Sequence, residues 1–106
     1  MATNLLAWDA VWKECQARPG DTNASFTFSL TNVSVEPVVI YDTSTTCDCS
    51  VARLPENPWV VLPEGTGRIQ ATVDLRGRVG AVTNYVIVFT SKGNRLLTTK
   101  TVLPKR

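Results

Sequence analysis

The stretch Ser25-Phe26-Thr27-Phe28-Ser29-Leu30-Thr31-Asn32 alternates polar and apolar side chains from Ser25 to Thr31. Phe26, Phe28 and Leu30 fall on one side of an extended chain, and serine and threonine fall on the other. A period of two with this aromatic and β-branched content is typical of a strand with one face in a core and one in solvent. The stretch therefore predicts a half-buried β-strand.

Further segments of the same kind flank this one. Residues 68–75, 84–90 and 97–103 alternate again, and residues 59–61 form a short crossing strand bracketed by prolines. Residues 38–41 are continuously apolar, which indicates a strand covered on both faces. The residues that we expect in the core are Phe26, Phe28, Leu30, Ile40, Ile69, Val73, Val86 and Val88.

The N-terminal segment, residues 4–16, fits two structures. Its two tryptophans, Val11 and Cys15 match the i, i+3, i+4, i+7 spacing of a helix. The segment is short, however, and runs directly into a turn sequence with proline and glycine at residues 17–21. We therefore expect an irregular edge strand here rather than a short helix.

About seven short strands at regular spacing predict an all-β fold, namely an immunoglobulin-like antiparallel β-sandwich of about seven strands. A chain of 106 residues is long enough for one core of moderate size. No linker, internal repeat or low-complexity tract divides it. We expect a single immunoglobulin-like domain over residues 1–106.

Charge and hydropathy exclude two classes of partner. The formal net charge of +2 is far from the basic excess of a nucleic-acid-binding domain. No apolar run approaches the ~18 residues that a membrane span requires. Residues 1–6 lack both the charged start and the apolar core of a signal peptide, so none is expected in this chain. The predicted partners therefore include neither nucleic acid nor the membrane interior.

The residues that usually carry catalysis are missing or scattered. The chain has no histidine, the commonest general base and metal ligand. Its carboxylates lie in turns and strands without the paired spacing of acid-base catalysis, and no nucleophile elbow, P-loop or dinucleotide fingerprint occurs. The sequence predicts a protein that is not an enzyme and has no cofactor.

Residues 84–90 carry more apolar side chains than one buried face requires. Val86 and Val88 fall on one side, and Tyr85, Ile87 and Phe89 fall on the other. An apolar strip on what should be the solvent side is typical of a surface that a partner covers. We therefore predict that Tyr85, Ile87 and Phe89 form an interaction face, for a protein partner or for self-association.

The three tryptophans, Trp8, Trp12 and Trp59, have two interpretations. Flat indole faces suit sugar rings, so the three could form a carbohydrate platform. In small sandwiches, tryptophans more often cover the core or close its open ends, where a large apolar ring is buried. We expect this second role.

Cys47-Asp48-Cys49 and the more distant Cys15 are the candidate thiol site. Residues i and i+2 of a strand have Cα atoms about 6.5–7 Å apart, at the upper limit of disulfide geometry, so a bridge between Cys47 and Cys49 is not expected. Two thiolates are too few for a closed zinc site. We expect structural cysteines, buried or bridged, with a thiol-redox site or a soft-metal site for an ion such as Cu(I) as alternatives.

Several motifs occur together in a characteristic order. They are Phe26-x-Phe28-x-Leu30-Thr31-Asn32, Pro37-Val38-Val39-Ile40, Cys47-Asp48-Cys49, Leu62-Pro63-Glu64-Gly65 and Val73-Asp74-Leu75-Arg76-Gly77-Arg78-x-Gly80. Over residues 8–104 the chain resembles a bacterial family known only as domain of unknown function 1573. It departs from the family pattern at Asp48, where glycine is usual, and at Glu64, an extra residue in the usual Pro-Gly.

The resemblance has consequences for fold and setting. Members of that family resemble the immunoglobulin folds of Hydin-type and major-sperm-protein-like domains, and similar domains are typically exported by bacteria. It therefore implies an extracytoplasmic location, periplasmic or secreted. The predicted function is a non-catalytic extracytoplasmic immunoglobulin-like module for protein–protein interaction or structural assembly. The alternative is a thiol-redox or copper-binding site at Cys47 and Cys49.

Overall fold

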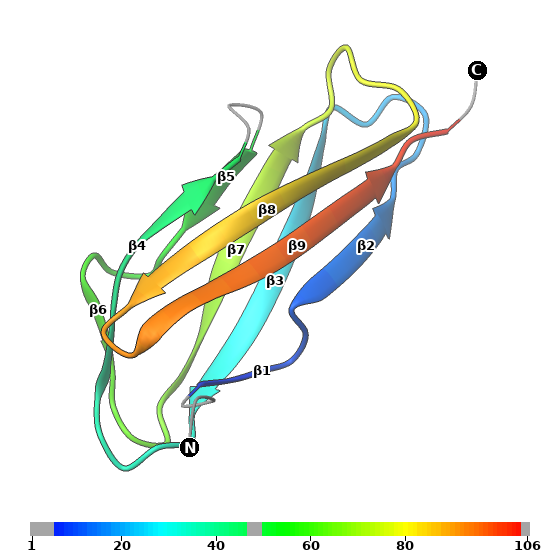
Figure 1. Ribbon diagram of the computed structural model, residues 1–106. Coiled ribbons are helices and arrows are strands. Elements are labelled where there is room, and N and C mark those ends of the chain that lie inside the picture. The colour runs from blue at the N-terminus through cyan, green and yellow to red at the C-terminus, as the bar shows by residue number, and fades with distance from the viewer. Residues whose placement is uncertain (1–5, 47–49, 105–106) are drawn as a thin grey trace.

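The computed structural model describes residues 6–46 and 50–104, which form nine β-strands in two sheets. Figure 1 shows the two sheets stacked as a sandwich, with the start of β1 and the end of β9 at opposite ends of it. The strands are β1 (Leu6–Trp8), β2 (Trp12–Gln16), β3 (Asn23–Asn32), β4 (Val38–Thr45), β5 (Ser50–Arg53), β6 (Trp59–Val61), β7 (Thr66–Asp74), β8 (Ala81–Thr90) and β9 (Gly93–Val102).

One sheet has four strands in the order β1-β3-β7-β5, and the other has five in the order β2-β9-β8-β4-β6. This confirms the predicted all-β immunoglobulin-like sandwich, with nine strands in place of about seven. The additional strands arise because the N-terminal segment forms two short strands, one in each sheet, and because residues 50–53 form β5. The expected antiparallel pairing holds throughout the described residues except between β2 and β9, which are parallel.

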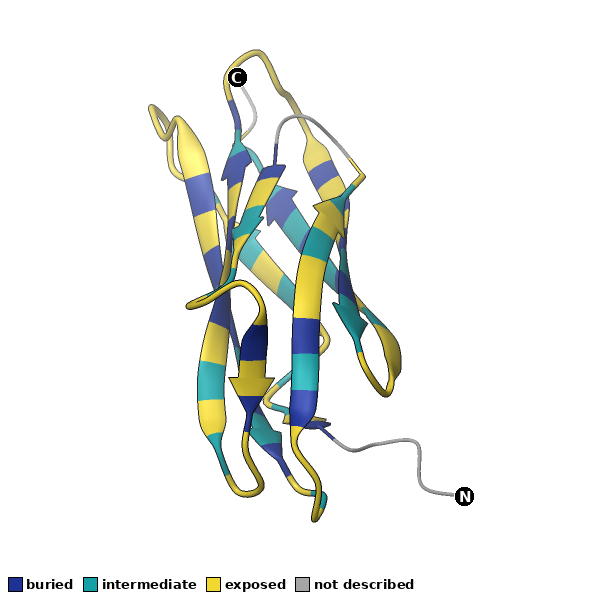
Figure 2. Cartoon of the chain, turned by 90° about the vertical axis from the view of Figure 1, so that its left-hand side faces the viewer, coloured by how far each residue is buried: buried dark blue, intermediate teal, exposed yellow. Residues whose placement is uncertain are grey.

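The core lies between the sheets and is filled by every second residue of the long strands. Figure 2 shows this alternation as bands of buried and exposed residues along each strand. Phe28 of β3 and Ile69 of β7 are register partners, so they lie side by side in the same sheet, and both are completely buried. All eight residues that the sequence predicts for the core are buried.

Strand β4 differs from its prediction on one face. Val38 and Ile40 are completely buried, but Tyr41 is 52% exposed. The register with β8 shifts between Ile40 and Asp42, which marks a β-bulge. Because Val38 and Ile40 point into the core, strand alternation places Val39 and Tyr41 on the outer face, so residues 38–41 are covered on one face and not on both.

A tryptophan on the short strand β6 closes the sandwich at one end. Trp59 is only 8% exposed, and its indole lies directly on the backbone of Gly67 in β7, in the opposite sheet. A Cβ at this position would occupy the same space as the six-membered ring of the indole. Glycine is therefore required here for close approach, and Trp59 has the predicted role of covering the core.

Asn32, the last residue of β3, joins three segments of the chain. Its side chain is completely buried. The amide nitrogen donates to the carbonyl oxygens of Val61 (2.9 Å) and Glu36 (2.8 Å), and the amide oxygen accepts from Ser34 N (2.9 Å) and Ser34 Oγ (2.7 Å). Its backbone N–H donates to Gly65 O at 2.9 Å. Through its side chain and its backbone, Asn32 thereby fixes both loops at this end of the sandwich, residues 33–37 and 62–65.

Replacing Asn32 with alanine is expected to lower the free energy of unfolding by roughly 2–4 kcal/mol, because buried carbonyl and amide groups lose their partners. The matched control is Asn23→Ala at the exposed start of the same strand, which should change it by less than about 0.5 kcal/mol. Urea unfolding followed by tryptophan fluorescence measures both. Equal effects of the two substitutions would contradict the role assigned to Asn32.

Gly67→Ala is expected to cost roughly 1–3 kcal/mol, because the new methyl group displaces the Trp59 ring from a packed site. The same substitution in a Trp59→Phe background should cost less, since the smaller ring leaves space for the methyl group. Thermal and urea unfolding of the four proteins in this cycle provide the test. Additive effects would show that the contact between Gly67 and Trp59 is not what constrains this site.

Candidate functional site

The predicted interaction face lies on the outer surface of the five-stranded sheet. On β8, Val86 and Val88 are buried between the sheets, whereas Tyr85 is 40% exposed. Ile87 and Phe89 are half-buried on the same outer surface as Tyr85. β8 is the middle strand of this sheet, so these three side chains lie at its centre.

The strand register adds two exposed apolar residues to this face. Leu96 of β9 is the register partner of Ile87 and is 50% exposed. Thr98 of β9 is the register partner of both Tyr85 and Trp12, so these residues form one row across three strands. Trp12 is 51% exposed. We call these five residues the apolar face: Trp12, Tyr85, Ile87, Phe89 and Leu96.

The outer surface of the four-stranded sheet has a different character. The outward positions of β3 are serines and threonines from Ser25 to Thr31. The outward positions of β7 include Arg68, Gln70 and Thr72, all exposed. The two outer surfaces of one sandwich therefore differ, with aromatic and aliphatic side chains at the centre of one, and hydroxyl, amide and guanidinium groups on the other apart from the exposed Val51 on the edge strand β5.

Sequence reasoning missed Leu96 and misassigned Trp12. Leu96 precedes the buried Leu97, and the alternation of β9 was counted only from Leu97 onward. Trp12 was expected to cover the core with the other tryptophans, yet the structure separates the three. Trp59 is in the core, Trp8 is half-buried at an open end, and Trp12 is on the outer face. They form no common carbohydrate platform.

The position of Trp12 depends on how the chain changes sheets at Asp9. The backbone N–H of Asp9 donates to Ser29 O of β3 at 2.9 Å. Ser29 N donates back to Asp9 Oδ1 at 3.0 Å, and Ala10 N donates to the same oxygen at 2.8 Å. The carboxylate thus ends the β1–β3 ladder, and the next residues join β9 instead.

Lys13 of β2 spans the gap between the two sheets at this point. Its Nζ donates to Asp9 Oδ2 at 2.7 Å and also donates to Thr27 O. The same ammonium lies 5.4 Å from the centroid of the Phe28 ring, within the range of a cation–π interaction. Lys13 therefore ties the edge of the five-stranded sheet to the strand at the centre of the other sheet.

The charge of Asp9 is stabilised by these contacts. Partial burial works against ionisation, but the hydrogen bonds from Lys13, Ser29 N and Ala10 N outweigh it. The pKa of the Asp9 carboxyl is therefore held below its ordinary value of 3.8. Its contribution to stability is present above that value and is lost as the pH falls through the lower pKa of the folded state.

Of the three cysteines, the structure describes Cys15, and Cys47 and Cys49 lie outside the described residues. Cys15 is half-buried, faces inward from β2 and packs against the core as a free thiol. β4, which leads toward Cys47, is separated from β2 by β9 and β8. At ~4.8 Å per strand, about 14 Å lies between β2 and β4. The thiol-redox and soft-metal sites remain predictions.

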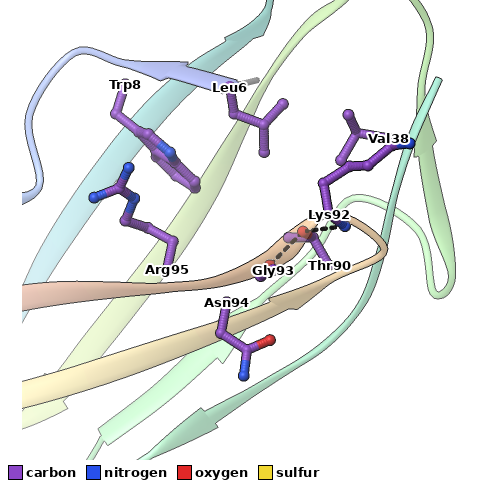
Figure 3. Close-up of a pocket in the computed structure, with 8 residues that line it drawn as sticks. All are labelled: Leu6, Trp8, Val38, Thr90, Lys92, Gly93, Asn94 and Arg95. Atoms are coloured by element: carbon purple, nitrogen blue, oxygen red, sulfur yellow. Dashed lines mark hydrogen bonds between the residues drawn. The ribbon is translucent and has the colours of Figure 1, made fainter. Parts of the chain in front are cut away.

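Lys92, Arg95 and Trp8 line a hollow at the open end of the sandwich (Figure 3). Arg95 of β9 points toward Trp8 of β1, and Thr90 Oγ1 donates to Gly93 O across the hairpin. Lys92 Nζ pairs with Glu36 Oε1 at 2.7 Å. The hollow holds only about 60 Å³, far below the ~300 Å³ of an ordinary ligand pocket.

The described residues contain neither a metal-binding cluster nor a membrane-spanning helix. In residues 6–46 and 50–104, no three side chains of the histidine, cysteine, aspartate and glutamate types come together in a way that could hold a metal ion. The same residues contain no helix with the length and apolar character needed to cross a membrane.

The two sheets and the sheet-crossing N-terminal segment define an immunoglobulin-like β-sandwich of the PapD-like and major-sperm-protein class. The chain belongs to the family described as "Protein of unknown function (DUF1573)", whose model matches residues 7–102. This confirms the family resemblance of the sequence motifs. A comparison with curated protein sequences finds no match.

Solved structures share the fold at low sequence identity. A protein of unknown function from Porphyromonas gingivalis W83 superposes with a TM-score of 0.79 and 13% identity over 93% of this chain and 46% of that one. The PapD-like domain 7 of human CEP192 superposes with a TM-score of 0.73 and 9% identity over 98% of this chain and 88% of that one. WR4, a C. elegans MSP family member, superposes with a TM-score of 0.65 and 8% identity over 94% of this chain and 98% of that one. This chain thus spans about half of the P. gingivalis protein.

Asp9→Asn is expected to lower the free energy of unfolding at pH 7 by about 0.5–1 kcal/mol, the range of a partly exposed ion pair, because the amide cannot accept from the Lys13 ammonium as a carboxylate does. The difference from the wild type should shrink as the pH falls below 3.8. Urea titrations between pH 2.5 and pH 7 measure this difference. Asp42→Asn, at an exposed position of β4, is the matched control, and an identical pH profile for both variants would contradict the assignment.

Proposed function

We propose that this domain is a non-catalytic interaction or assembly module that binds a protein surface through its apolar face. The observation that carries the proposal is the contrast between the two outer surfaces of the sandwich. One is polar, as expected for a surface in water, and the other exposes Trp12, Tyr85 and Leu96 in a contiguous patch. Soluble monomers rarely leave such a patch open unless a partner covers it.

The composition of the apolar face resembles that of a protein interface. Trp12 and Tyr85 belong to the residue types that most often dominate binding energy. Polar residues surround the patch, because Glu14 and Lys100 occupy the row beyond Trp12, and Asp42 and Asn94 flank Phe89. An apolar centre within a polar rim is the usual anatomy of an interface.

The electrostatics of the domain support a non-catalytic role. Lys92 lowers the pKa of Glu36, and Arg76 lowers the pKa of Asp74 to about 2, in each case chiefly through a hydrogen bond from the basic side chain. These pairs and the Asp9–Lys13 pair lie on different parts of the surface. Each carboxylate is thereby held ionised by its own cation, whereas acid-base catalysis needs groups whose pKa values lie near the working pH.

The location of the protein forms part of the proposal. Domains similar to this family are typically exported by bacteria, which supports an extracytoplasmic setting, periplasmic or secreted. In that setting the expected occupant of the apolar face is another protein or a second copy of this chain.

Ile87→Lys is expected to weaken association at least about tenfold while the domain stays folded, because a charge at the centre of an apolar interface is costly to desolvate. The matched control is Gln70→Lys on the outer face of the four-stranded sheet, which adds the same charge to the polar side. Sedimentation velocity over a concentration series measures self-association. Quantitative capture from an extract of the source organism measures partner binding.

Circular dichroism and urea unfolding verify that both variants remain folded. The proposal requires Ile87→Lys to lose self-association or a captured partner that Gln70→Lys retains. Identical behaviour of the two variants in both assays would remove it.

A further inference from the structure

The sandwich has four sheet edges, and two of them are covered by side-chain hydrogen bonds. On β5, Ala52 O accepts from Thr43 Oγ1 at 3.4 Å and Ser50 O accepts from Thr45 Oγ1 at 3.1 Å. On β6, Val61 O accepts from the Asn32 amide. β6 is also bracketed by prolines, which prevent further pairing. Both edges are thereby protected from pairing with another chain.

The edges formed by β1 and β2 differ in length and exposure. β1 has three residues, and Leu6 within it is buried. β2 has five residues, and Trp12, Glu14 and Gln16 are all exposed. Figure 1 shows β2 at the rim of its sheet, beyond β9. β2 is therefore the longer of these two edge strands. Residues 23–28 of β3 extend past β1 and, within the described part of the chain, also lack a strand partner on that side, but Lys13 Nζ bonds to Thr27 O within them.

The ladder with β9 determines which backbone groups of β2 are available. Thr98 N donates to Val11 O and Ala17 N donates to Val102 O, both at 2.8 Å, so the odd-numbered residues of β2 bond to β9. Backbone groups alternate in direction along a strand. The N–H and C=O groups of Trp12, Glu14 and Gln16 therefore point away from the sheet, where no residue of the described chain bonds to them.

We propose that this edge of β2 accepts an extended segment of another protein as a sixth strand of the sheet. This inference rests on the proposed function and specifies how the partner is held. Three outward N–H groups and three outward carbonyl groups at strand spacing match an extended backbone, because such a segment can pair with all of them at once. Trp12 lies on the edge strand itself, so the added strand would also cover its exposed indole.

A second copy of the chain fits this edge poorly. If two β2 strands paired antiparallel with full overlap, Glu14 would lie opposite its own counterpart. If the register shifts by two residues so that it centres on Lys13, Lys13 of one copy lies opposite Lys13 of the other. If it shifts by two residues the other way, the only outward residues that pair are Glu14 of one copy with Gln16 of the other. Like charges directly opposite each other destabilise a strand pair. The occupant is therefore a strand from a different protein.

The side chains of β2 define the chemistry of this strand. Trp12 and Glu14 both lie on the outer surface and are two residues apart. A complementary segment has an apolar side chain beside Trp12 and a lysine or arginine beside Glu14, two residues apart on its own outward face. Its inward side chains must be small or polar, because Lys13 occupies the inward side of β2 between the sheets.

A probe peptide can test this directly. We choose acetyl-Thr-Val-Thr-Lys-Thr-Val-Thr-amide, which reads the same in both directions and so serves parallel and antiparallel addition equally. A second peptide has glutamate in place of lysine. The backbone amides of Trp12, Glu14 and Gln16 report binding through NMR shifts and hydrogen exchange.

Two variants of Glu14 separate the backbone from the charge. Glu14→Pro removes an N–H that points away from β9, so the native ladder stays intact and the fold is retained. Glu14→Ala keeps this N–H and removes the charge. Circular dichroism and urea unfolding confirm that both are folded.

The lysine peptide at millimolar concentration is expected to shift these three amides saturably and to slow exchange at Glu14 and Gln16. The glutamate peptide should bind about two- to fivefold more weakly, as expected for reversal of one cross-strand charge pair. Glu14→Ala should bind both peptides equally, and Glu14→Pro should bind neither with measurable affinity.

Several results would overturn the inference. Among them are the absence of saturable shifts at these amides, equal binding by Glu14→Pro and Glu14→Ala, and peptide-free exchange protection that rises with protein concentration, which would assign the edge to a second copy. Peptide shifts confined to Ile87 and Leu96 would also overturn it while leaving the proposed function standing. Edge binding that persists in Ile87→Lys, together with unchanged partner capture, would instead remove the proposed function alone.

Discussion

The carboxylate of Asp9 fixes the point at which the chain crosses from one sheet to the other, and much of the surface depends on that point. It takes the place of a backbone carbonyl of β1, because it accepts the Ser29 N–H of β3 that such a carbonyl would accept if β1 continued. The chain is then free to pair with β9.

The long strands could be predicted from sequence because each carries its own pattern. The alternation around Phe28 and Ile69 identifies both the strand and its buried side, and no distant residue alters that assignment. The N-terminal segment could not be assigned from its own pattern in this way. Its two short strands belong to different sheets, and the side-chain bonds of Asp9 and Lys13 decide where one ends. Likewise, the bulge between Ile40 and Asp42 follows from pairing with β8, which the apolar run itself does not encode.

The same distinction explains which parts of the candidate site were foreseen. Tyr85, Ile87 and Phe89 are neighbours on one strand, so a period of two places them on one side. Leu96 and Trp12 join them only through the registers of β8 with β9 and of β9 with β2. The availability of the β2 edge is also a property of the ladder, because the pairing with β9 decides which N–H groups point outward.

The parallel pairing of β2 with β9 also determines how the domain carries mechanical load. Both strands run toward the same end of the sandwich (Figure 1). Tension applied before β2 and after β9, in opposite directions, therefore acts along the strands and shears the ladder from Trp12–Thr98 to Gln16–Val102. These hydrogen bonds share the force and must break together, whereas a hairpin pulled at its open end loses its bonds one after another. A load in this direction would therefore have to break this ladder before β2 and β9 could separate.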